Sequence, residues 1–350
     1  MCSMRVILVS PLPPPVGGIA SWTEGYIKYA EKNNIKCHLI NSAVVGKRVH
    51  TGKLSYKDEI KRTKKLHDEL KHLSKKEKDI VIHYNASCFT KGLIRDFFVL
   101  AGIKAPIVYQ CHCNLDTNIN NRLSKLMFRL VCKIVDVVCV LNTASVRTAK
   151  LYHNNVFYVP NFIDKPILEN KYINEHIENV CFVGRVEKRK GIQELLDAAK
   201  ALPEICFNII GPIEDEDFKN ICISNVRFWG SVDNKEIFSI LNKMDVYVLP
   251  SYSEGFPLGV LEAMSCGVPV IASDVGAVKD MIGKGGGLII KPKSVDDIIS
   301  SLNKLDSKKI RKQMSEININ KVKKFYTIDV VIKQFLHIYE LCGMRGTFLK

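Results

Sequence analysis

One segment, residues 245–273, constrains the fold of this chain more than any other. Its first apolar run predicts a buried strand that ends at Pro250. A loop rich in glycine and proline follows and opens a helix, which is expected to end at Gly267 because Pro269 cannot extend it. The next apolar run predicts another strand. A strand, loop, helix and strand in this order are typical of a parallel α/β sheet, in which ligands bind at the carboxyl ends of the strands.

The same alternation of strand and helix patterns runs through both halves of the chain. In the first half we expect strands at 4–10, 36–41, 79–84, 106–111, 136–141 and 156–159 and helices at 18–32, 55–76, 90–101, 118–134 and 144–151. In the second half we expect strands at 179–184, 205–210, 226–228, 245–249, 269–272 and 287–290 and helices at 190–201, 215–222, 234–242, 258–266, 276–281 and 295–302. This pattern predicts two doubly wound, Rossmann-like parallel-sheet domains of the α/β class, facing each other across a cleft. We place the first domain at 1–165, the second at 176–324 and a C-terminal helix at 325–350.

Two glutamates lie close together in the 245–273 segment. Glu254 is in the loop, and Glu262 is one to two turns into the helix. Because a helix N-terminus attracts phosphate, a polar ligand held at the start of this helix would lie within reach of both carboxylates.

A second loop provides cations. The strand that ends at Val183 is followed by Gly184 and Arg185, and Lys190 and Gly191 then open a helix. Glycine lets the backbone approach a diphosphate, arginine offers a fork to phosphate oxygens, and lysine adds a point charge. Cations fixed at this place would stabilise a departing diphosphate more strongly in the transition state than in the ground state.

The first half contributes two further candidate positions. Gly17 and Gly18 follow the first strand without the Gly-x-Gly-x-x-Gly spacing of dinucleotide-binding loops, so NAD binding is not indicated. His112 comes directly after a predicted strand and is therefore expected at the edge of the sheet that binds ligands.

The possible metal ligands do not form a recognisable metal site. Cys111 and Cys113 flank His112, but no second Cys/His pair at zinc spacing accompanies them. Asp215 and Asp217 form an Asp-x-Asp sequence at an expected helix start, where acidic residues suit the helix dipole. We therefore expect no essential metal and no cofactor.

The two glutamates, their Gly/Pro loop and the cationic loop resemble the retaining GT-B glycosyltransferases of the glycosyl transferases group 1 type. The resemblance covers nearly the whole chain and is most specific from 180 to 292. It implies transfer of a sugar, with retention of anomeric configuration, from a nucleotide-diphosphate sugar to a hydroxyl of a glycan or polyprenyl-linked acceptor. Many such enzymes build bacterial surface polysaccharide (capsule, O-antigen or exopolysaccharide). The C-terminal domain would bind the donor and the N-terminal domain the acceptor, and the C-terminal helix would cross back to the N-terminal domain.

The resemblance also implies roles for individual residues. Glu262 would hold the ribose hydroxyls, Glu254 the sugar hydroxyls, and Arg185 and Lys190 the leaving diphosphate. His112 would lie close to the transferred sugar. The remaining donor-site positions implied by the resemblance are Gly17, Gly18, Gly184, Gly255, Phe256, Pro257, Leu258 and Gly259.

One position departs from the family. Its Asn-Gly at the domain junction is replaced here by Asn161-Phe162, so the local loop geometry is expected to differ.

The charge of the chain is concentrated in its first half. The net charge is +15, and residues 1–165 carry 26 Lys and Arg against 12 Asp and Glu, whereas residues 166–350 carry 25 against 24. The stretch 56–78 predicts a helix with an apolar stripe of Ile60, Thr63, Leu66, Leu70 and Leu73. Its other face carries Lys57, Lys61, Arg62, Lys64, Lys65, Lys71, Lys75 and Lys76.

A narrow apolar stripe under a broad basic face is typical of an interfacial helix. We therefore expect a cytoplasmic protein that associates peripherally with the anionic inner face of the cell membrane through 56–78. The alternative is that the stripe packs on the sheet and the charges are solvated. No apolar run reaches the roughly 18–20 residues of a membrane span, and the cysteines fall within strand and helix patterns, as reduced thiols of cytosolic proteins do.

Two other functions fit parts of the sequence. Sugar-nucleotide epimerases share the two-domain architecture and would consume a donor without any acceptor. A basic nucleic-acid-binding protein would explain the pI of 9.2, but the basic residues lack interleaved aromatics and no recognition motif is present, so no nucleic acid is expected.

Overall fold

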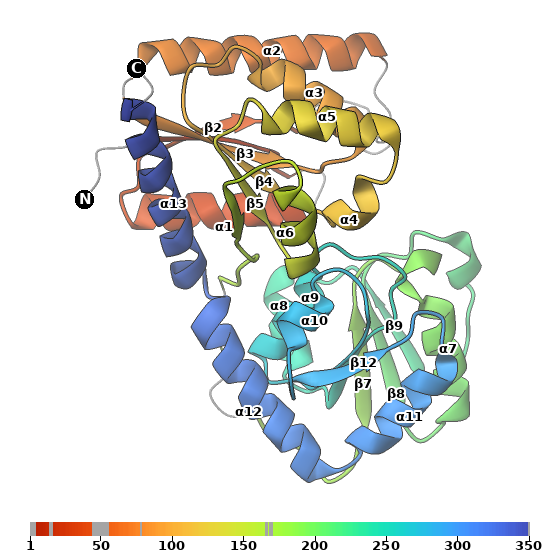
Figure 1. Cartoon of the computed structure of the whole chain (residues 1–350). Helices are drawn as coiled ribbons and strands as arrows, with labels where there is room; N and C mark the ends of the chain where they lie inside the picture. The colour runs from red at the N-terminus through yellow and green to blue at the C-terminus, as the bar shows by residue number, and fades with distance from the viewer. Residues whose placement is uncertain are drawn as a thin grey trace. The chain divides into compact units, whose positions relative to one another are not determined.

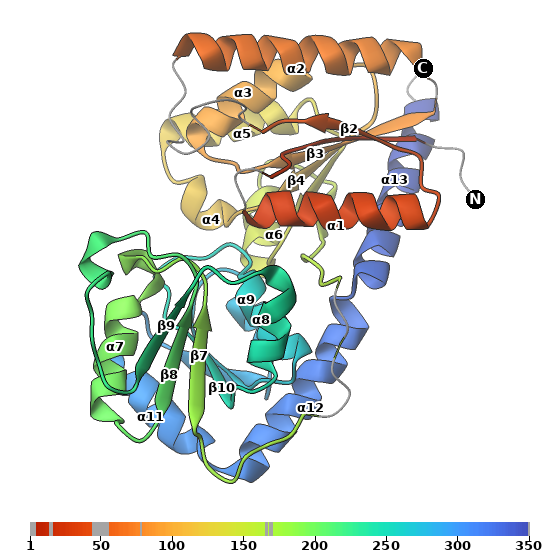
Figure 2. The same cartoon turned by 180° about the vertical axis from the view of Figure 1, so that it is seen from behind.

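A computed structural model describes residues 5–13, 17–43, 56–77, 79–164, 167 and 171–348 of the chain. It divides the chain into two compact units, each drawn in Figures 1 and 2. Unit 1 comprises Met1–Phe162 together with Ile328–Lys350, and unit 2 comprises Ile163–Thr327. Residues 14–16 of the loop before Gly17, Lys78 of the predicted interfacial helix, and residues 165, 166 and 168–170 near the end of the predicted first domain lie outside the described ranges.

Unit 1 contains a six-stranded sheet in the order β2-β1-β3-β4-β5-β6. Every neighbouring pair is parallel. The strands are β1 (Arg5–Ser10), β2 (Cys37–Asn41), β3 (Ile80–Ala86), β4 (Ile107–Cys111), β5 (Val137–Val140) and β6 (Val156–Tyr158). Strand order reverses between β1 and β3, and their carboxyl ends are where a sheet of this kind binds ligands.

Helices cover both faces of the unit 1 sheet. Figures 1 and 2 show α2, α3 and α5 on one face and α1 and α13 on the other. Two separate apolar clusters fill the space between the helices and the sheet, and successive strand residues such as Ile7 and Leu8 alternate between them. The helices are α1 (Gly18–Lys32), α2 (Tyr56–Lys76), α3 (Thr90–Leu100), α4 (Leu115–Asn118), α5 (Arg122–Cys132), α6 (Thr143–Lys150) and α13 (Ile328–Phe348).

Unit 2 contains a second six-stranded parallel sheet, in the order β12-β11-β10-β7-β8-β9. Its strands are β7 (Asn179–Val183), β8 (Cys206–Ile210), β9 (Val226–Gly230), β10 (Val246–Leu249), β11 (Val270–Ser273) and β12 (Gly287–Ile290). Strand order reverses between the adjacent strands β7 and β10. This is the strand order of dinucleotide-binding domains, whose ligands lie at that reversal.

The helices of unit 2 also lie on both faces of its sheet. Figures 1 and 2 show α7 and α11 on one face and α8 and α9 on the other. They are α7 (Ile192–Ala201), α8 (Asn234–Leu241), α9 (Leu258–Ser265), α10 (Val278–Ile282), α11 (Val295–Leu305) and α12 (Lys308–Phe325).

Two of the predicted helices are wrong as drawn from the sequence. The helix predicted at 118–134 is interrupted, because the Asn121 side chain accepts a hydrogen bond from the Ser124 amide at 2.8 Å and caps a new helix there. The helix predicted at 215–222 is only a short 3-10 turn, Glu216–Phe218. Asp215 does not cap a helix, because its carboxylate accepts a hydrogen bond from the distant Lys188 amide at 2.6 Å.

The C-terminal helix begins later than predicted. Tyr326 ends α12, its carbonyl accepts a hydrogen bond from the Ile163 amide at 2.8 Å, and Thr327 bridges to Ile163. The chain therefore leaves unit 2 at this point, and α13 starts at Ile328. Val331, Phe335 and other residues of α13 belong to the same buried cluster as strands β1, β3, β4 and β5, so the helix returns to the first domain, as the family resemblance implied.

The apolar stripe of α2 does not face outward, contrary to the interfacial-helix interpretation. Leu66 and Leu70 are buried in the core of unit 1, and Leu73 packs against the same core. Only Ile60 of the stripe is exposed, with 69% of its surface accessible. The spacing of the stripe suits packing on a sheet and lying on a membrane surface equally well. In the structure, the stripe packs on the core of unit 1. Of the helices in the described ranges, none is long and apolar enough to cross a membrane.

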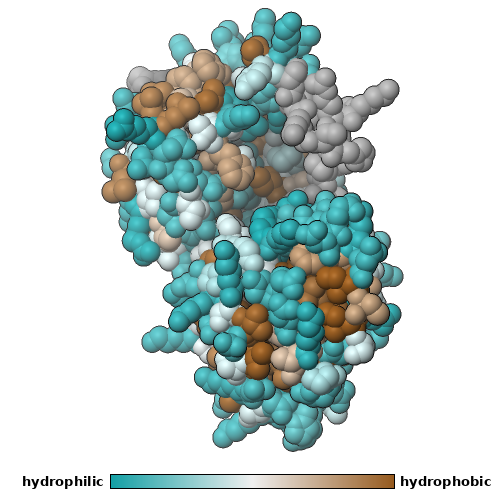
Figure 3. Space-filling view, turned by 90° about the vertical axis from the view of Figure 1, so that its right-hand side faces the viewer, coloured by the Kyte–Doolittle hydropathy of each residue, from teal (hydrophilic) through white to brown (hydrophobic). Residues whose placement is uncertain are grey.

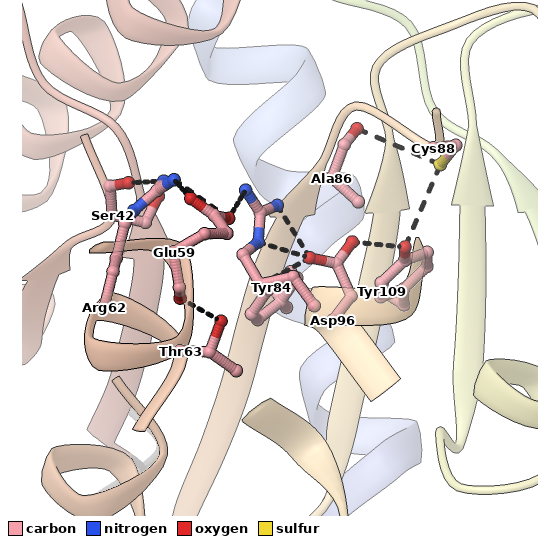
Figure 4. A network of polar contacts seen from close by, with 10 residues as sticks. Ser42, Glu59, Arg62, Thr63, Tyr84, Ala86, Cys88, Asp96 and Tyr109 are labelled. Carbon is pink, nitrogen blue, oxygen red and sulfur yellow. Dashed lines mark hydrogen bonds and ion pairs between the residues drawn. The ribbon is translucent and has the colours of Figure 1, made fainter. Parts of the chain in front are cut away.

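A buried polar network ties α2 and α3 to the sheet (Figure 4). The fully buried Asp96 carboxylate accepts hydrogen bonds from the Tyr84 and Tyr109 hydroxyls at 2.7 and 2.8 Å and pairs with Arg95 at 2.7 Å. Arg62 of α2 pairs with Glu59 at 3.2 Å and donates to the Ser42 carbonyl. Arg62 is therefore a structural residue and not part of the solvent-facing basic surface that the sequence predicted.

Candidate functional site

The two loops singled out in the sequence follow the two strands at which the order of the unit 2 sheet reverses. The cationic loop leaves β7, and the loop that holds Glu254 leaves β10. Because β7 and β10 are adjacent and parallel, both loops emerge at the same edge of the sheet. The fold thus brings together two segments more than sixty residues apart in the sequence.

Two glycines let the helices approach this edge closely. Gly191 has φ +71°, and a Cβ there would lie 2.1 Å from the Pro250 carbonyl oxygen. A Cβ on Gly259 would lie 2.4 Å from the Tyr247 hydroxyl oxygen. The first turns of α7 and α9 consequently pack against the ends of the strands without side chains between them.

Lys190 and Glu254 are in direct contact. The Lys190 Nζ atom lies 2.6 Å from Glu254 Oε1, and the two side chains are only 14% and 9% exposed. An ammonium group has three N–H donors, and this bond uses one of them. The pair therefore presents a cation and a carboxylate, side by side, at the carboxyl edge of the unit 2 sheet.

Tyr247 is a site residue that the sequence analysis missed. It lies within β10, and its hydroxyl donates to the Val183 carbonyl at the end of β7, 3.3 Å away. Burial raises the pKa of Tyr247 well above its usual range, and the charges of Cys181, Glu254 and Glu262 raise it further. Both glutamates therefore act on the same buried phenol. No sequence signal distinguishes this tyrosine from an ordinary strand residue.

The other cations of the first loop are held differently. Arg185 is 56% exposed, and its Nε lies 3.7 Å from Glu187. Lys188 pairs with Asp217 at 2.5 Å, and Arg189 pairs with Glu187 at 2.7 Å. Lys188 and Arg189 are thus engaged at the surface, whereas Lys190 turns inward.

The remaining unit 2 residues predicted for the donor site lie near the start of α9 and the end of β7. Gly255 accepts a backbone hydrogen bond from Ala277 at 2.9 Å, and the buried Phe256 ring meets Tyr326 edge-on at 6.0 Å. Pro257 precedes Leu258, the first residue of α9. Gly184 follows β7 directly, where its amide donates to the Ile210 carbonyl of β8 at 2.9 Å.

In unit 1, Gly17 and Gly18 lie at the start of α1. Gly17 has extended backbone, with φ −170°. No heavy atom of the described residues lies within 4 Å of a Cβ built on either glycine. Neither the backbone angle of Gly17 nor crowding by the described part of the chain explains these glycines.

His112 follows β4 at the carboxyl edge of the unit 1 sheet. Its Nε2 lies 3.0 Å from Asn85 Oδ1, and its ring meets Trp22 edge-on at 5.6 Å. Burial, and next the charge of His83, lower the pKa of His112 to about 3. The imidazole is therefore neutral at pH 7.

The possible metal ligands have other partners. Asp215 and Asp217 are bonded to the backbone and the side chain of Lys188, respectively. Cys111 and Cys113 lie beside the buried Cys88 thiol. Across the described ranges, no three His, Cys, Asp or Glu side chains come together in a way that could hold a metal ion.

The comparison with protein-family models gives a match in unit 2. The family model described as "Glycosyl transferases group 1" matches residues 165–321, which span most of unit 2 and both of its candidate loops.

Two curated relatives align with larger parts of the chain. The "Capsular polysaccharide biosynthesis glycosyltransferase CapM" of Staphylococcus aureus is 25% identical over 373 residues, with 93% of each chain covered. The "N,N'-diacetylbacillosaminyl-diphospho-undecaprenol alpha-1,3-N-acetylgalactosaminyltransferase" of Campylobacter jejuni is 24% identical over 273 residues, with 70% of this chain and 67% of the relative covered.

Among solved structures, Anabaena Alr3699/HepE in complex with UDP and glucose is similar, with a TM-score of 0.70 and 15% identity. The similarity covers 96% of this chain and 99% of that one. It confirms the predicted fold class, two Rossmann-like parallel-sheet domains of the GT-B type.

Proposed function

We propose that this chain, whose residues 165–321 match the model of the glycosyl transferases group 1 family, transfers a sugar with retention of anomeric configuration. The donor is a nucleotide-diphosphate sugar, and the acceptor is a hydroxyl of a glycan or polyprenyl-linked precursor of bacterial surface polysaccharide. The observation that carries the proposal is the contact of Lys190 with Glu254, 2.6 Å apart, where the loops after β7 and β10 meet.

Four charged side chains of unit 2 each have a role in the proposed reaction. The bond between the sugar C1 and the diphosphate oxygen breaks, and a bond from C1 to the acceptor oxygen forms on the same face. The leaving phosphate oxygen takes the proton of the acceptor hydroxyl. Arg185 and Lys190 stabilise the charge that grows on the diphosphate, which is why they act mainly in the transition state. Glu254 holds the sugar hydroxyls and Glu262 the ribose hydroxyls.

The relatives support a role in surface polysaccharide. One is named for capsular polysaccharide biosynthesis, and the other for transfer to a diphospho-undecaprenol. The solved neighbour holds UDP and glucose. A UDP-sugar donor and a polyprenyl-diphosphate-linked acceptor are therefore the first substrates to test, and no cofactor or metal takes part in the proposed steps.

The donor is identified by a thermal-shift screen against UDP-, GDP- and ADP-sugars, followed by transfer assays in EDTA-containing buffer.

We expect Glu262→Ala to raise KM for the donor by about 10- to 100-fold, which corresponds to the loss of a hydrogen bond to a charged group. The effect falls on KM because ribose contacts are alike in the ground and transition states. Glu254→Ala is expected to lower kcat instead. Equal, small effects of both substitutions on kcat and KM would contradict the site assignment, and rapid loss of donor without acceptor would indicate an epimerase.

The basic surface of α2 is the proposed membrane-docking element. Lys57, Lys61, Lys64 and Lys65 are exposed on this helix, as are Tyr56 and Ile60, at 83% and 69%. Figure 3 shows apolar patches among hydrophilic side chains on the face of the protein that it draws. Attraction to anionic lipid contributes about 1 kcal/mol per basic residue near the surface. The enzyme would thereby meet lipid-linked acceptors at the cytoplasmic face of the membrane.

We expect salt-sensitive binding to vesicles that contain anionic lipid and none to neutral vesicles, because surface attraction is screened within roughly 8–10 Å at physiological salt. Replacing Lys61, Lys64 and Lys65 with glutamine should weaken partitioning by roughly 100-fold, from about 1 kcal/mol each. Arg62 is left intact because it pairs inside unit 1. The matched control replaces three exposed lysines of unit 2, Lys200, Lys219 and Lys304. Equal vesicle sedimentation of the two triple variants would remove α2 from the membrane contact.

A further inference from the structure

A line of hydrogen bonds runs across the carboxyl edge of the unit 1 sheet and ends at His112. The Thr23 hydroxyl donates to the Ile19 carbonyl at 2.8 Å within α1. Thr23 Oγ1 lies 2.6 Å from Ser10 Oγ on β1, and Ser10 Oγ lies 2.8 Å from Asn85 Nδ2 on β3. Asn85 Oδ1 lies 3.0 Å from His112 Nε2. Four separate segments of the chain contribute to this line.

The direction of every bond in the line is fixed by its first member. A carbonyl oxygen can only accept, so the single hydroxyl proton of Thr23 is committed to Ile19. Ser10 must then donate to Thr23, and with its own proton used it accepts from the Asn85 amide. Asn85 consequently turns its carbonyl oxygen toward His112. Only an N–H can donate to that oxygen, so the Nε2 atom of His112 carries a proton.

The other ring nitrogen of His112 is then an acceptor. The neutral imidazole has one N–H, and Nε2 holds it. Within the described part of the chain, the Nδ1 atom of His112 has no hydrogen-bond partner. The residue is half-buried, so a ligand at this edge of the sheet can reach it.

We propose that Asn85, oriented by Ser10 and Thr23, is the positioning residue that fixes the Nε2–H tautomer of His112, so that Nδ1 accepts a hydrogen bond from a substrate hydroxyl. This rests on the proposed function, which brings a sugar to His112. A ring held as a pure acceptor favours a substrate with a hydroxyl at that point. It disfavours an analogue that lacks the hydroxyl, because the nitrogen is then left unpaired.

A second histidine–amide pair on the same strands provides the internal control. His83 Nε2 lies 2.8 Å from Gln110 Oε1, and His83 Nδ1 lies 2.5 Å from the Tyr339 hydroxyl. His83 is fully buried and both of its nitrogens are paired inside unit 1. It has the same chemistry without access to substrate.

The test reads the tautomer directly in the full chain. In ¹⁵N-histidine-labelled protein at pH 7, long-range ¹H–¹⁵N spectra are expected to show His112 protonated at Nε2, with assignment by His112→Gln. Asn85→Leu and Thr23→Val should shift the ring toward the Nδ1–H form and lower kcat/KM by about 10- to 100-fold, the effect of one unpaired buried polar group. Thr23→Ser keeps the hydroxyl and should restore both. Gln110→Leu should move the His83 signals and leave those of His112 unchanged.

Deoxy analogues of the donor sugar and of the acceptor then locate the hydroxyl. With the analogue that lacks the relevant group, Asn85→Leu should change kcat/KM less than threefold. An Nδ1-protonated His112 in the unsubstituted protein would overturn the inference, and so would a shifted tautomer with unchanged kcat/KM. A protein that transfers sugar from no nucleotide sugar would instead refute the proposed function, and the tautomer measurement tells these two failures apart.

Discussion

Replacing Lys190 with alanine is expected to remove about 2–4 kcal/mol of transition-state stabilisation, by analogy with the loss of an oxyanion-hole donor, and so to lower kcat/KM for sugar transfer. Lys190 is the cation of its loop that turns inward, and it touches the carboxylate of Glu254. In the proposed reaction this charge stabilises the leaving diphosphate. A substitution that removes it is therefore expected to act on the chemical step.

The control for this substitution lies two residues away on the same loop. Lys188 is 68% exposed and pairs with Asp217 at the surface, so Lys188→Ala should change kcat/KM less than threefold. Because removing one partner of a mostly buried pair also destabilises a protein, the Tm of each variant is measured alongside. A Glu254→Gln, Lys190→Ala double-mutant cycle should show strong coupling. Equal losses for Lys188→Ala and Lys190→Ala would mean that the loop is a diffuse basic surface.

The second large effect is expected on stability. Asp96→Ala should destabilise unit 1 by about 3–5 kcal/mol, because it removes the fully buried carboxylate that pairs with Arg95 at 2.7 Å and leaves this largely buried guanidinium with the more distant Glu59 carboxylate, 4.0 Å away. It also removes the acceptor of two buried tyrosine hydroxyls. Asp68→Ala, which removes an exposed carboxylate from α2, should change stability by less than about 0.5 kcal/mol.

The tryptophans allow each unit to be followed separately. The chain has two, of which Trp22 lies in the core of unit 1 and Trp229 in unit 2. In a Trp229→Phe background, urea unfolding monitored by fluorescence reports unit 1 alone. A midpoint that does not move on Asp96→Ala would contradict the role assigned to this network.

The positions of the strands could be predicted from the sequence to within a few residues, because parallel strands that are buried on both faces consist of continuous apolar runs rich in valine and isoleucine. The pairing of Lys190 with Glu254 could not be predicted from the sequence of either loop alone. It follows from the strand order, which makes β7 and β10 neighbours.

Contacts between distant segments account for what sequence reasoning missed. Asp215 bonds to the Lys188 amide instead of opening a helix, and Asn85 meets His112 only because β3 and β4 pair. The stripe of α2 was ambiguous for another reason. Leucines spaced for one helix face, such as Leu66 and Leu70, suit a sheet and a membrane equally well, and the structure uses them on the sheet.

The return of α13 to unit 1 has a consequence for how the protein is made. On the ribosome, the strands of unit 1 are synthesised first, but the helix that covers Trp22 and Val81 follows only after the whole of unit 2. Until then that apolar face of the first sheet is covered by α1 but lacks α13, although unit 2 can already complete its core. A nascent chain from which α13 is still missing can thus hold a finished second domain and an unfinished first one, the kind of intermediate that chaperones protect.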